Sequence, residues 1–77
     1  MTVADQILLW LAGGAQQRQD LEQRARTAFG IRDSAAAEVR VSLALVTLTR
    51  RGLVSLHPVR GFQITPAGKA KTATPKP

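Results

Sequence analysis

Residues 39–65, VRVSLALVTLTRRGLVSLHPVRGFQIT, decide the fold of this chain. They predict a helix, a glycine stop and two short strands joined by a tight turn. Gly52 lies where a helix ends in the left-handed conformation, which glycine adopts at the least cost. Leu53 is then expected to contact Leu48 across the stop, as the apolar pair of a Schellman motif does. This contact assigns the Leu48 side of the helix to the core.

Two segments after the glycine stop are rich in strand-forming residues. Residues 53–56 and 62–65 contain Leu, Val, Phe and Ile, and the second segment alternates apolar and polar residues. The residues between them include Pro58 and Gly61, which favour a turn. The sequence therefore predicts an antiparallel hairpin directly after the helix.

A helix that leads into a hairpin resembles the recognition helix and wing of a winged helix-turn-helix domain. The segments LTRRGLV (residues 48–54) and FQITPAGK (residues 62–69) carry this resemblance, which covers about residues 3 to 70. They are most similar to the N-terminal winged helix of Mrr-type restriction proteins. The resemblance implies an α+β, mostly α fold with three helices followed by a two-stranded antiparallel β-hairpin wing. It also implies DNA binding, with the third helix in the major groove and the wing on the backbone or minor groove.

The composition bounds the domain organisation. We expect one domain over residues 1–68 and a disordered basic tail over residues 69–77, because Lys, Ala, Thr and Pro cannot build a core there. The chain has no cysteine, which excludes disulfides and thiolate chemistry. The longest apolar run, residues 7–12, is too short to cross a bilayer, and the acidic start does not resemble a signal peptide. We expect a cytoplasmic protein of bacterial or phage type with no membrane partner.

The charges are distributed unevenly along the chain. Residues 1–38 hold four arginines against five acids, whereas residues 39–77 hold seven basic residues and no acid, for a formal net charge of +6. A C-terminal half in which every charged residue is basic is suited to binding a polyanion. The alternative is that these residues form a basic surface and tail that only face solvent and bind no partner. Together with the hairpin pattern, the charge favours double-stranded DNA as the partner.

Local signals predict the first helix. Thr2 is its expected N-cap, and Asp5 faces the positive end of the helix. The helix ends at Gly13-Gly14. Its core face is formed by Val3, Ala4, Ile7, Leu8, Trp10 and Leu11. Leu9 falls on the other side, either as a lone surface leucine or as part of a dimer contact.

A second helix is expected over about residues 16–29, with Gly30 as its stop and a narrow apolar stripe that includes Leu21 and Ala25. Opposite charges four residues apart predict three ion pairs on its surface: Arg18–Glu22, Asp20–Arg24 and Glu22–Arg26. We expect this helix to be structural, with its charged surface exposed to solvent. The polar residues at its start are candidates for phosphate contacts.

The third helix, expected from Asp33 or Ser34 to about Arg51, carries two apolar stripes. The first, assigned to the core, consists of Val41, Ala44, Leu45 and Leu48. The second, on the opposite side, consists of Val39, Leu43 and Val46. Winged-helix relatives expose polar side chains there. Three explanations stay open: packing under the second helix or the N-terminal region, a dimer or partner surface, or contact of Leu43 and Val46 with the methyl groups of thymine or methylcytosine.

Two polar ridges separate these stripes. One consists of Arg40, Thr47 and Arg51, and the other of Glu38, Ser42 and Thr49. Together with the resemblance, they predict the DNA-binding residues Arg40, Ser42, Thr47, Arg50, Arg51, Arg60 and Lys69. Arg60 at the hairpin turn suits a narrow minor groove. We expect a small DNA-binding protein, such as a transcriptional regulator or a mobile-element accessory factor.

The alternative function is a protein-interaction module, such as a phage-type inhibitor or adaptor. It would use the Val39, Leu43 and Val46 surface, with Leu9 as a further candidate. The same residues would serve a homodimer, and the sequence leaves the oligomeric state open.

The sequence predicts no catalysis. His57 is the only histidine, and no second metal ligand or partner carboxylate accompanies it. We expect it to contact a phosphate when it is protonated. No glycine-rich phosphate loop or carboxylate cluster is present. The Mrr resemblance implies a nuclease only in full-length relatives, whose nuclease domain has no counterpart in this sequence. We therefore expect no enzyme activity, cofactor or metal.

Overall fold

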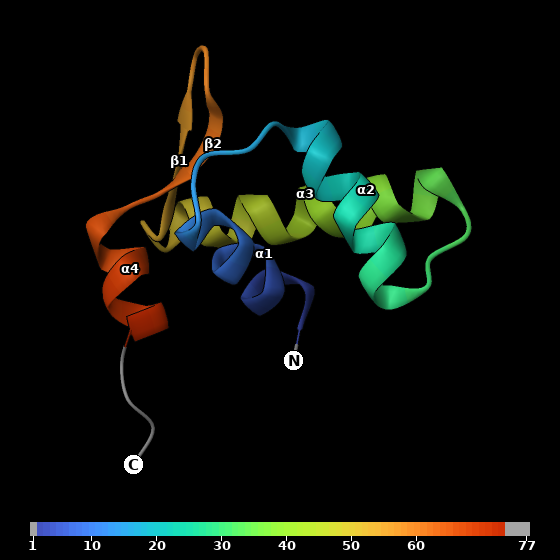
Figure 1. Cartoon of the computed structure of the whole chain (residues 1–77), viewed down its shortest axis with the longest axis horizontal. Coiled ribbons are helices and arrows are strands. Elements are labelled where there is room, and N and C mark those ends of the chain that lie inside the picture. Colours follow the sequence, from blue (N-terminus) through green and yellow to red (C-terminus); the bar gives the residue numbers. More distant parts are fainter. Residues whose placement is uncertain (1, 74–77) are drawn as a thin grey trace.

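The computed structural model describes residues 2–73 of the chain. Its elements are α1 (Val3–Ala12), α2 (Arg18–Phe29), α3 (Ser34–Arg50), β1 (Val54–His57), β2 (Gly61–Ile64) and α4 (Pro66–Ala73). Figure 1 shows α3 lying across the molecule, the hairpin rising from its C-terminal end, and α4 at the foot of the hairpin. The described chain is mostly helical with one two-stranded antiparallel sheet, which confirms the α+β class.

Helix α1 begins with the cap that the sequence predicts. The Thr2 hydroxyl accepts a hydrogen bond from the Asp5 backbone N–H at 3.1 Å, and an Asp5 carboxylate oxygen accepts the Thr2 N–H at 3.4 Å. These reciprocal bonds form a capping box. The helix ends at Ala12, directly before the two glycines.

Helix α2 begins at Arg18, later than the expected start near Gln16, because Gln16 forms a bridge with Phe62 and Gln17 is the N-cap. The predicted stop of α2 and the predicted start of α3 are confirmed. Gly30 ends α2 in the left-handed conformation, with φ of 64°. Asp33, rather than Ser34, is the N-cap of α3, because its carboxylate accepts the Ala35 N–H at 2.9 Å.

The Gly52 stop of α3 is confirmed. Gly52 has φ of 73°. Its N–H donates to the Thr49 carbonyl at 3.0 Å, and the N–H of Leu53 donates to the Leu48 carbonyl at 3.0 Å. These are the two bonds of a Schellman motif. Leu48 and Leu53 are both buried in the core, so the expected apolar pair is also present.

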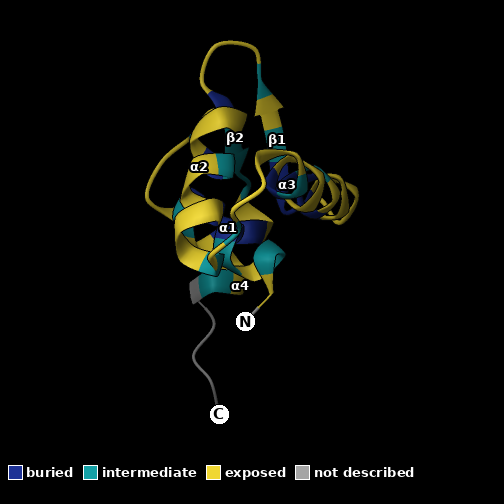
Figure 2. Ribbon diagram, turned by 90° about the vertical axis from the view of Figure 1, so that its right-hand side faces the viewer, coloured by how far each residue is buried: buried dark blue, intermediate teal, exposed yellow. Residues whose placement is uncertain are grey.

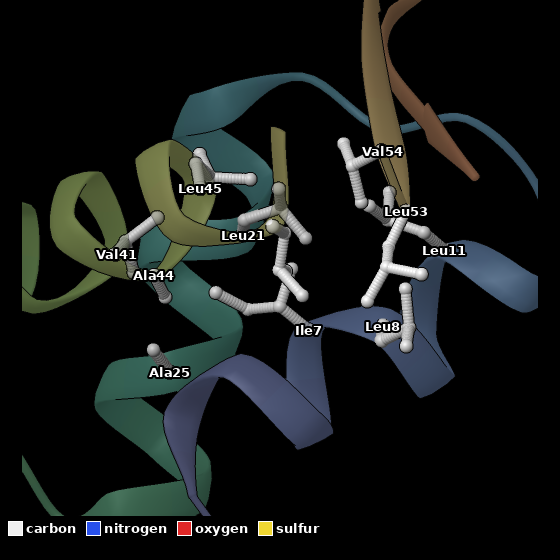
Figure 3. Close-up of a cluster of buried hydrophobic side chains, with 11 residues drawn as sticks. Ile7, Leu8, Leu11, Leu21, Ala25, Val41, Ala44, Leu45, Leu53 and Val54 are labelled. Atoms are coloured by element: carbon white, nitrogen blue, oxygen red, sulfur yellow. The ribbon is translucent and has the colours of Figure 1, made fainter. Parts of the chain in front are cut away.

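The core lies where the three long helices and the base of the hairpin meet. Figure 2 shows that exposed residues cover most of the outer surfaces of α2 and α3. The buried cluster, most of which is labelled in Figure 3, consists of Ile7, Leu8, Leu11, Leu21, Ala25, Val41, Ala44, Leu45, Leu48, Leu53 and Val54. The first apolar stripe of α3 is therefore core, as predicted.

The hairpin has the predicted antiparallel pairing, but both strands are displaced by one residue from the expected ranges. Val54 pairs with Ile64, and Leu56 pairs with Phe62. Leu53 is excluded from the first strand because it belongs to the helix stop. Thr65 is excluded from the second because it caps the next helix, where its hydroxyl accepts the Gly68 N–H at 3.1 Å.

One pairing has no counterpart in the sequence predictions. Between α1 and α2, the Gln16 N–H donates to the Phe62 carbonyl at 2.9 Å, and the Phe62 N–H donates to the Gln16 carbonyl at 2.8 Å. The connection thus forms an antiparallel bridge with β2. Gly61 permits this close approach: its φ is 89°, and a Cβ there would lie 2.5 Å from the Gln16 carbonyl oxygen.

The expected disordered tail from residue 69 is wrong for residues 69–73, which belong to α4. The helix starts with Thr65 as the cap and Pro66 at its first position, as the sequence predicts. It is held to the body because the Thr65 hydroxyl donates to the Gly52 carbonyl at 2.6 Å and the Thr65 N–H donates to the Leu53 carbonyl at 3.0 Å. Residues 74–77 of the expected tail lie outside the described residues.

Candidate nucleic-acid interface

The outward face of α3 carries the second apolar stripe. At about 100° per residue, the stripe projects away from the buried side of the helix. Val39, Leu43 and Val46 are 57%, 64% and 51% exposed. The explanation that they pack under α2 or the N-terminal region is therefore wrong. Arg50 lies in the same row, one turn beyond Val46, and is also exposed.

A groove runs along one flank of this face. It has a volume of ≈ 260 Å³ and lies between α3, the start of α2 and β2. Its lining consists of Arg18, Ser42, Leu45, Val46, Thr49, Arg50 and Phe62. Leu45, Val46 and Phe62 belong to this lining, and the surface of the groove is mostly apolar. The groove is therefore mainly an apolar surface beside Arg18 and Arg50.

Arg18 is fixed at this groove by residues from two helices. Its guanidinium donates a hydrogen bond to the Ser42 hydroxyl of α3 and lies 3.1 Å from the Glu22 carboxylate and 3.9 Å from that of Glu38. Within residues 2–73, both observed ion pairs involve Arg18, so the predicted pairs Asp20–Arg24 and Glu22–Arg26 are not formed. The two carboxylates partly neutralise the charge of Arg18, whereas Arg50 forms no ion pair within the part of the chain that the structure describes.

The hairpin turn is held from two sides. Nδ1 of His57 accepts the backbone N–H groups of Val59 and Arg60 at 3.1 and 3.0 Å. From the start of α2, the Gln17 side-chain amide donates to the Val59 carbonyl at 2.8 Å. These bonds hold the backbone that carries the exposed Arg60. Nδ1 of His57 is thus engaged with the backbone of the turn, and the expected contact of His57 with a phosphate stays a prediction.

The structure divides the predicted DNA-binding residues into groups. Ser42 and Arg50 line the groove, and Arg60 lies in the turn of the hairpin beside it. Three residues lie on the opposite flank of α3, roughly 140–180° around the helix axis from Ser42. These are Arg40, Thr47 and Arg51, all exposed. Lys69 belongs to α4. Figure 1 shows α4 at the foot of the hairpin, at the end opposite the turn.

Leu9, the remaining interface candidate, is 41% exposed and belongs to α1 rather than to the α3 face. Its position does not extend the row formed by Val39, Leu43 and Val46. A partner that covers the α3 row would therefore have to reach a different helix to cover Leu9 as well.

The sequence does not predict the place of Phe62 in the groove or the contact of Gln17 with the hairpin turn. It assigns Phe62 only to a strand, and it offers Gln17 only as a candidate for phosphate contacts at the start of a helix. Their places depend on the Gln16–Phe62 bridge, for which the sequence around Gln16 has no strand pattern. The run of polar residues at the start of α2 was the one available signal, and it indicated Gln17 and Arg18.

A second hollow lies between the α1–α2 connection and α2. It has a volume of ≈ 700 Å³ and is lined in part by Trp10, Asp20 and Arg24. Its lining contains no histidine, serine or cysteine. Over residues 2–73, no group of three His, Cys, Asp or Glu side chains is placed to hold a metal ion. In the same part of the chain, every helix is too short or too polar to cross a membrane.

Comparisons with family models, curated proteins and solved structures found no match to this chain.

Proposed function

We propose that the protein is a winged helix-turn-helix that binds double-stranded DNA, as a transcriptional regulator or mobile-element accessory factor. In this proposal α3 is the recognition helix and the β1–β2 hairpin is the wing. The observation that carries it is the exposed face of α3 beside a hairpin with an exposed arginine, in a half of the chain that contains no acid after Glu38.

The dimensions of α3 suit a major groove. The helix has 17 residues, which corresponds to a length of about 25 Å. The major groove is about 12 Å wide and admits an α-helix. Most of α3 beyond its buried stripe is free of other elements, and the adjacent hairpin projects from the body (Figure 2). A helix and a projecting hairpin can therefore engage the duplex together.

The two flanks of α3 would contact the two walls of the groove. On the hairpin flank, Arg50 and the Ser42 hydroxyl bind phosphates, and Arg60 enters or borders the minor groove. On the opposite flank, Arg40 and Arg51 bind phosphates of the other strand, and the Thr47 hydroxyl assists them. Lys69 is too far from the turn to share these contacts and adds long-range attraction. Phosphate contacts of this kind position the protein without specifying sequence.

A salt titration tests the proposal. Release of counterions from about four neutralised phosphates predicts that log K falls with log salt at a slope of roughly −3 to −4. Fluorescence anisotropy with a labelled duplex at several salt concentrations measures this slope. Absence of binding at low salt, or a slope near zero, would show that the basic half of the chain does not engage DNA.

The exposure of Val39, Leu43 and Val46 favours one second candidate, a protein-interaction module of the inhibitor or adaptor type. Leu43→Glu separates the two. Because Leu43 is exposed, the variant should fold, which circular dichroism verifies. Loss of DNA binding then supports the first function. Unchanged DNA binding together with loss of a dimer or protein complex supports the second.

A further inference from the structure

The row of α3 that projects farthest from the core is almost entirely aliphatic. Val39, Leu43 and Val46 follow one another at spacings of four and three residues, and each is more than half exposed. Arg50 is the next member of the row. In the proposed complex, Val39, Leu43 and Val46 face the floor of the major groove, where base edges are read, whereas Arg50 at the end of the helix reaches a phosphate.

Aliphatic side chains restrict what this row can recognise. Base edges in the major groove present hydrogen-bond donors and acceptors, and the C5-methyl group of thymine is the apolar exception. Valine and leucine offer no hydrogen bond, so a polar base edge covered by them loses water without gaining a partner. A thymine methyl loses only unfavourable contact with water. The row is thus complementary to thymine and poorly complementary to guanine or cytosine edges.

The charges around the row argue for a polyanion as its occupant. Arg40 and Arg51 lie along one flank. Arg50 and Arg60 lie toward the other, where Glu38, the one acid of α3, is 3.9 Å from the Arg18 guanidinium. If a second copy of the chain covered the row, these like charges would be brought together across the interface, which is unfavourable. DNA places phosphates on both sides of its major groove and therefore matches both flanks.

We propose that Leu43 and Val46 read the C5-methyl groups of thymine, so that the protein prefers duplexes with thymines beneath α3. This inference rests on the proposed DNA binding. Leu43 is the principal contact because it is the most exposed of the three. Val46 also lines the groove on the protein surface between α3, α2 and β2, together with Phe62.

Replacement of thymine by deoxyuridine tests the inference, because it removes the methyl group and keeps the base pair. The full chain is titrated with an A·T-rich duplex and with the same duplex containing uracil, at one salt concentration. We expect affinity to fall about fourfold for each methyl buried, the factor that corresponds to ~0.8 kcal/mol per buried carbon group.

The variant Leu43→Ala should show a clearly smaller difference in affinity between thymine and uracil duplexes than the wild type, because the principal contacting side chain is gone and only Val46 remains. Leu9→Ala is the matched control: it removes the same atoms from an exposed leucine on another helix and should keep the wild-type preference. Circular dichroism checks that both variants are folded.

Three results would overturn the inference while DNA binding stands. One is equal affinity of the wild type for both duplexes. Another is a Leu43→Ala variant that keeps the full thymine preference of the wild type. The third is tighter binding after methylation of cytosine at C5, with no loss on thymine-to-uracil replacement, which would assign the methyl to a different base. Failure to bind any duplex at low salt would instead overturn the proposed function itself.

Discussion

Nδ1 of His57 accepts the backbone N–H of Arg60 at 3.0 Å, so the ring of one residue sets the position of the other. The same nitrogen accepts the Val59 N–H at 3.1 Å. The imidazole thereby acts as a local cap of the hairpin turn. We expect its contribution to DNA binding to come from the ordering of Arg60 and not from a contact of its own with a phosphate.

Substitutions at His57 can separate these two roles. His57→Ala should lower DNA affinity several-fold and leave stability within about 1 kcal/mol, because the freed N–H groups are exposed to water. His57→Asn supplies an acceptor oxygen, which can cap N–H groups two residues onward, and should retain most of the affinity. His57→Lys keeps a cation without an acceptor and should behave like alanine. High affinity of the lysine variant alone would show that charge is what matters.

Removal of single arginines should change the salt dependence. If Arg50 and Arg40 each neutralise one phosphate, Arg50→Ala and Arg40→Ala should each reduce the magnitude of the salt slope by about 0.9. Arg24→Ala is the control, because Arg24 lines the other hollow, away from the α3 face. Measurement of the slope for the three variants decides which flanks contact DNA. A change confined to Arg50→Ala would restrict the interface to the hairpin flank.

The approach of β2 to the α1–α2 connection predicts a stability effect at Gly61. Gly61→Ala should lower the free energy of unfolding by about 1–3 kcal/mol, because a Cβ would lie 2.5 Å from the Gln16 carbonyl oxygen and φ is positive. Gly13→Ala is the matched control. Its Cβ would meet the Trp10 carbonyl oxygen at 3.6 Å, an ordinary contact, and we expect almost no loss. Urea unfolding of both variants measures the difference.

The capping box of α1 predicts a small dependence of stability on pH. Hydrogen bonds from Thr2, its side chain first and its backbone second, hold the pKa of Asp5 below its ordinary value. Since the folded-state pKa is below the unfolded one, the stabilisation is present above the unfolded value and is lost as pH falls through the folded value. Asp5 is exposed, so the effect should be modest.

Asp5→Asn tests this expectation. The variant should unfold at a lower temperature than the wild type near neutral pH, and the difference should vanish at acidic pH, where both side chains are uncharged. A difference that persists in acid would mean that the carboxylate charge is not the source. Thr2→Ala should cost about 1 kcal/mol, the usual value for a lost N-cap.

Signals that act within a few residues were readable from the sequence. Gly52 and Gly30 stop their helices in the left-handed conformation, and Thr2 and Asp33 cap theirs. Each feature depends on the conformational freedom of one residue or on one bond to a near neighbour. The errors fell at boundaries. Each observed strand is displaced by one residue from its expected range. Leu53 belongs to the stop of α3 and Thr65 to the cap of α4, so neither residue is part of a strand. Residues 69–73 were read as tail although they continue α4.

The candidate site was predicted less completely than the fold. The sequence located the polar and apolar rows of α3, but it did not tell which flank would lie beside the hairpin. In the folded chain, Ser42 accepts a hydrogen bond from Arg18, which lies 24 residues away in the sequence. Gln17 donates to the hairpin turn, which lies 42 residues away. Arg40, Thr47 and Arg51 belong to the other flank, so the predicted site divides in two.

By itself, the sequence determined the helices, the stop that leads into the hairpin, and the segregation of acids into residues 1–38. These features depend on the backbone preferences of single residues and on composition, and neither requires contacts between distant segments. Only the tertiary structure decided that Val39, Leu43 and Val46 face outward and that Gln16 binds Phe62. An apolar residue is buried or exposed according to what packs beside it, and that depends on how distant segments share one small core.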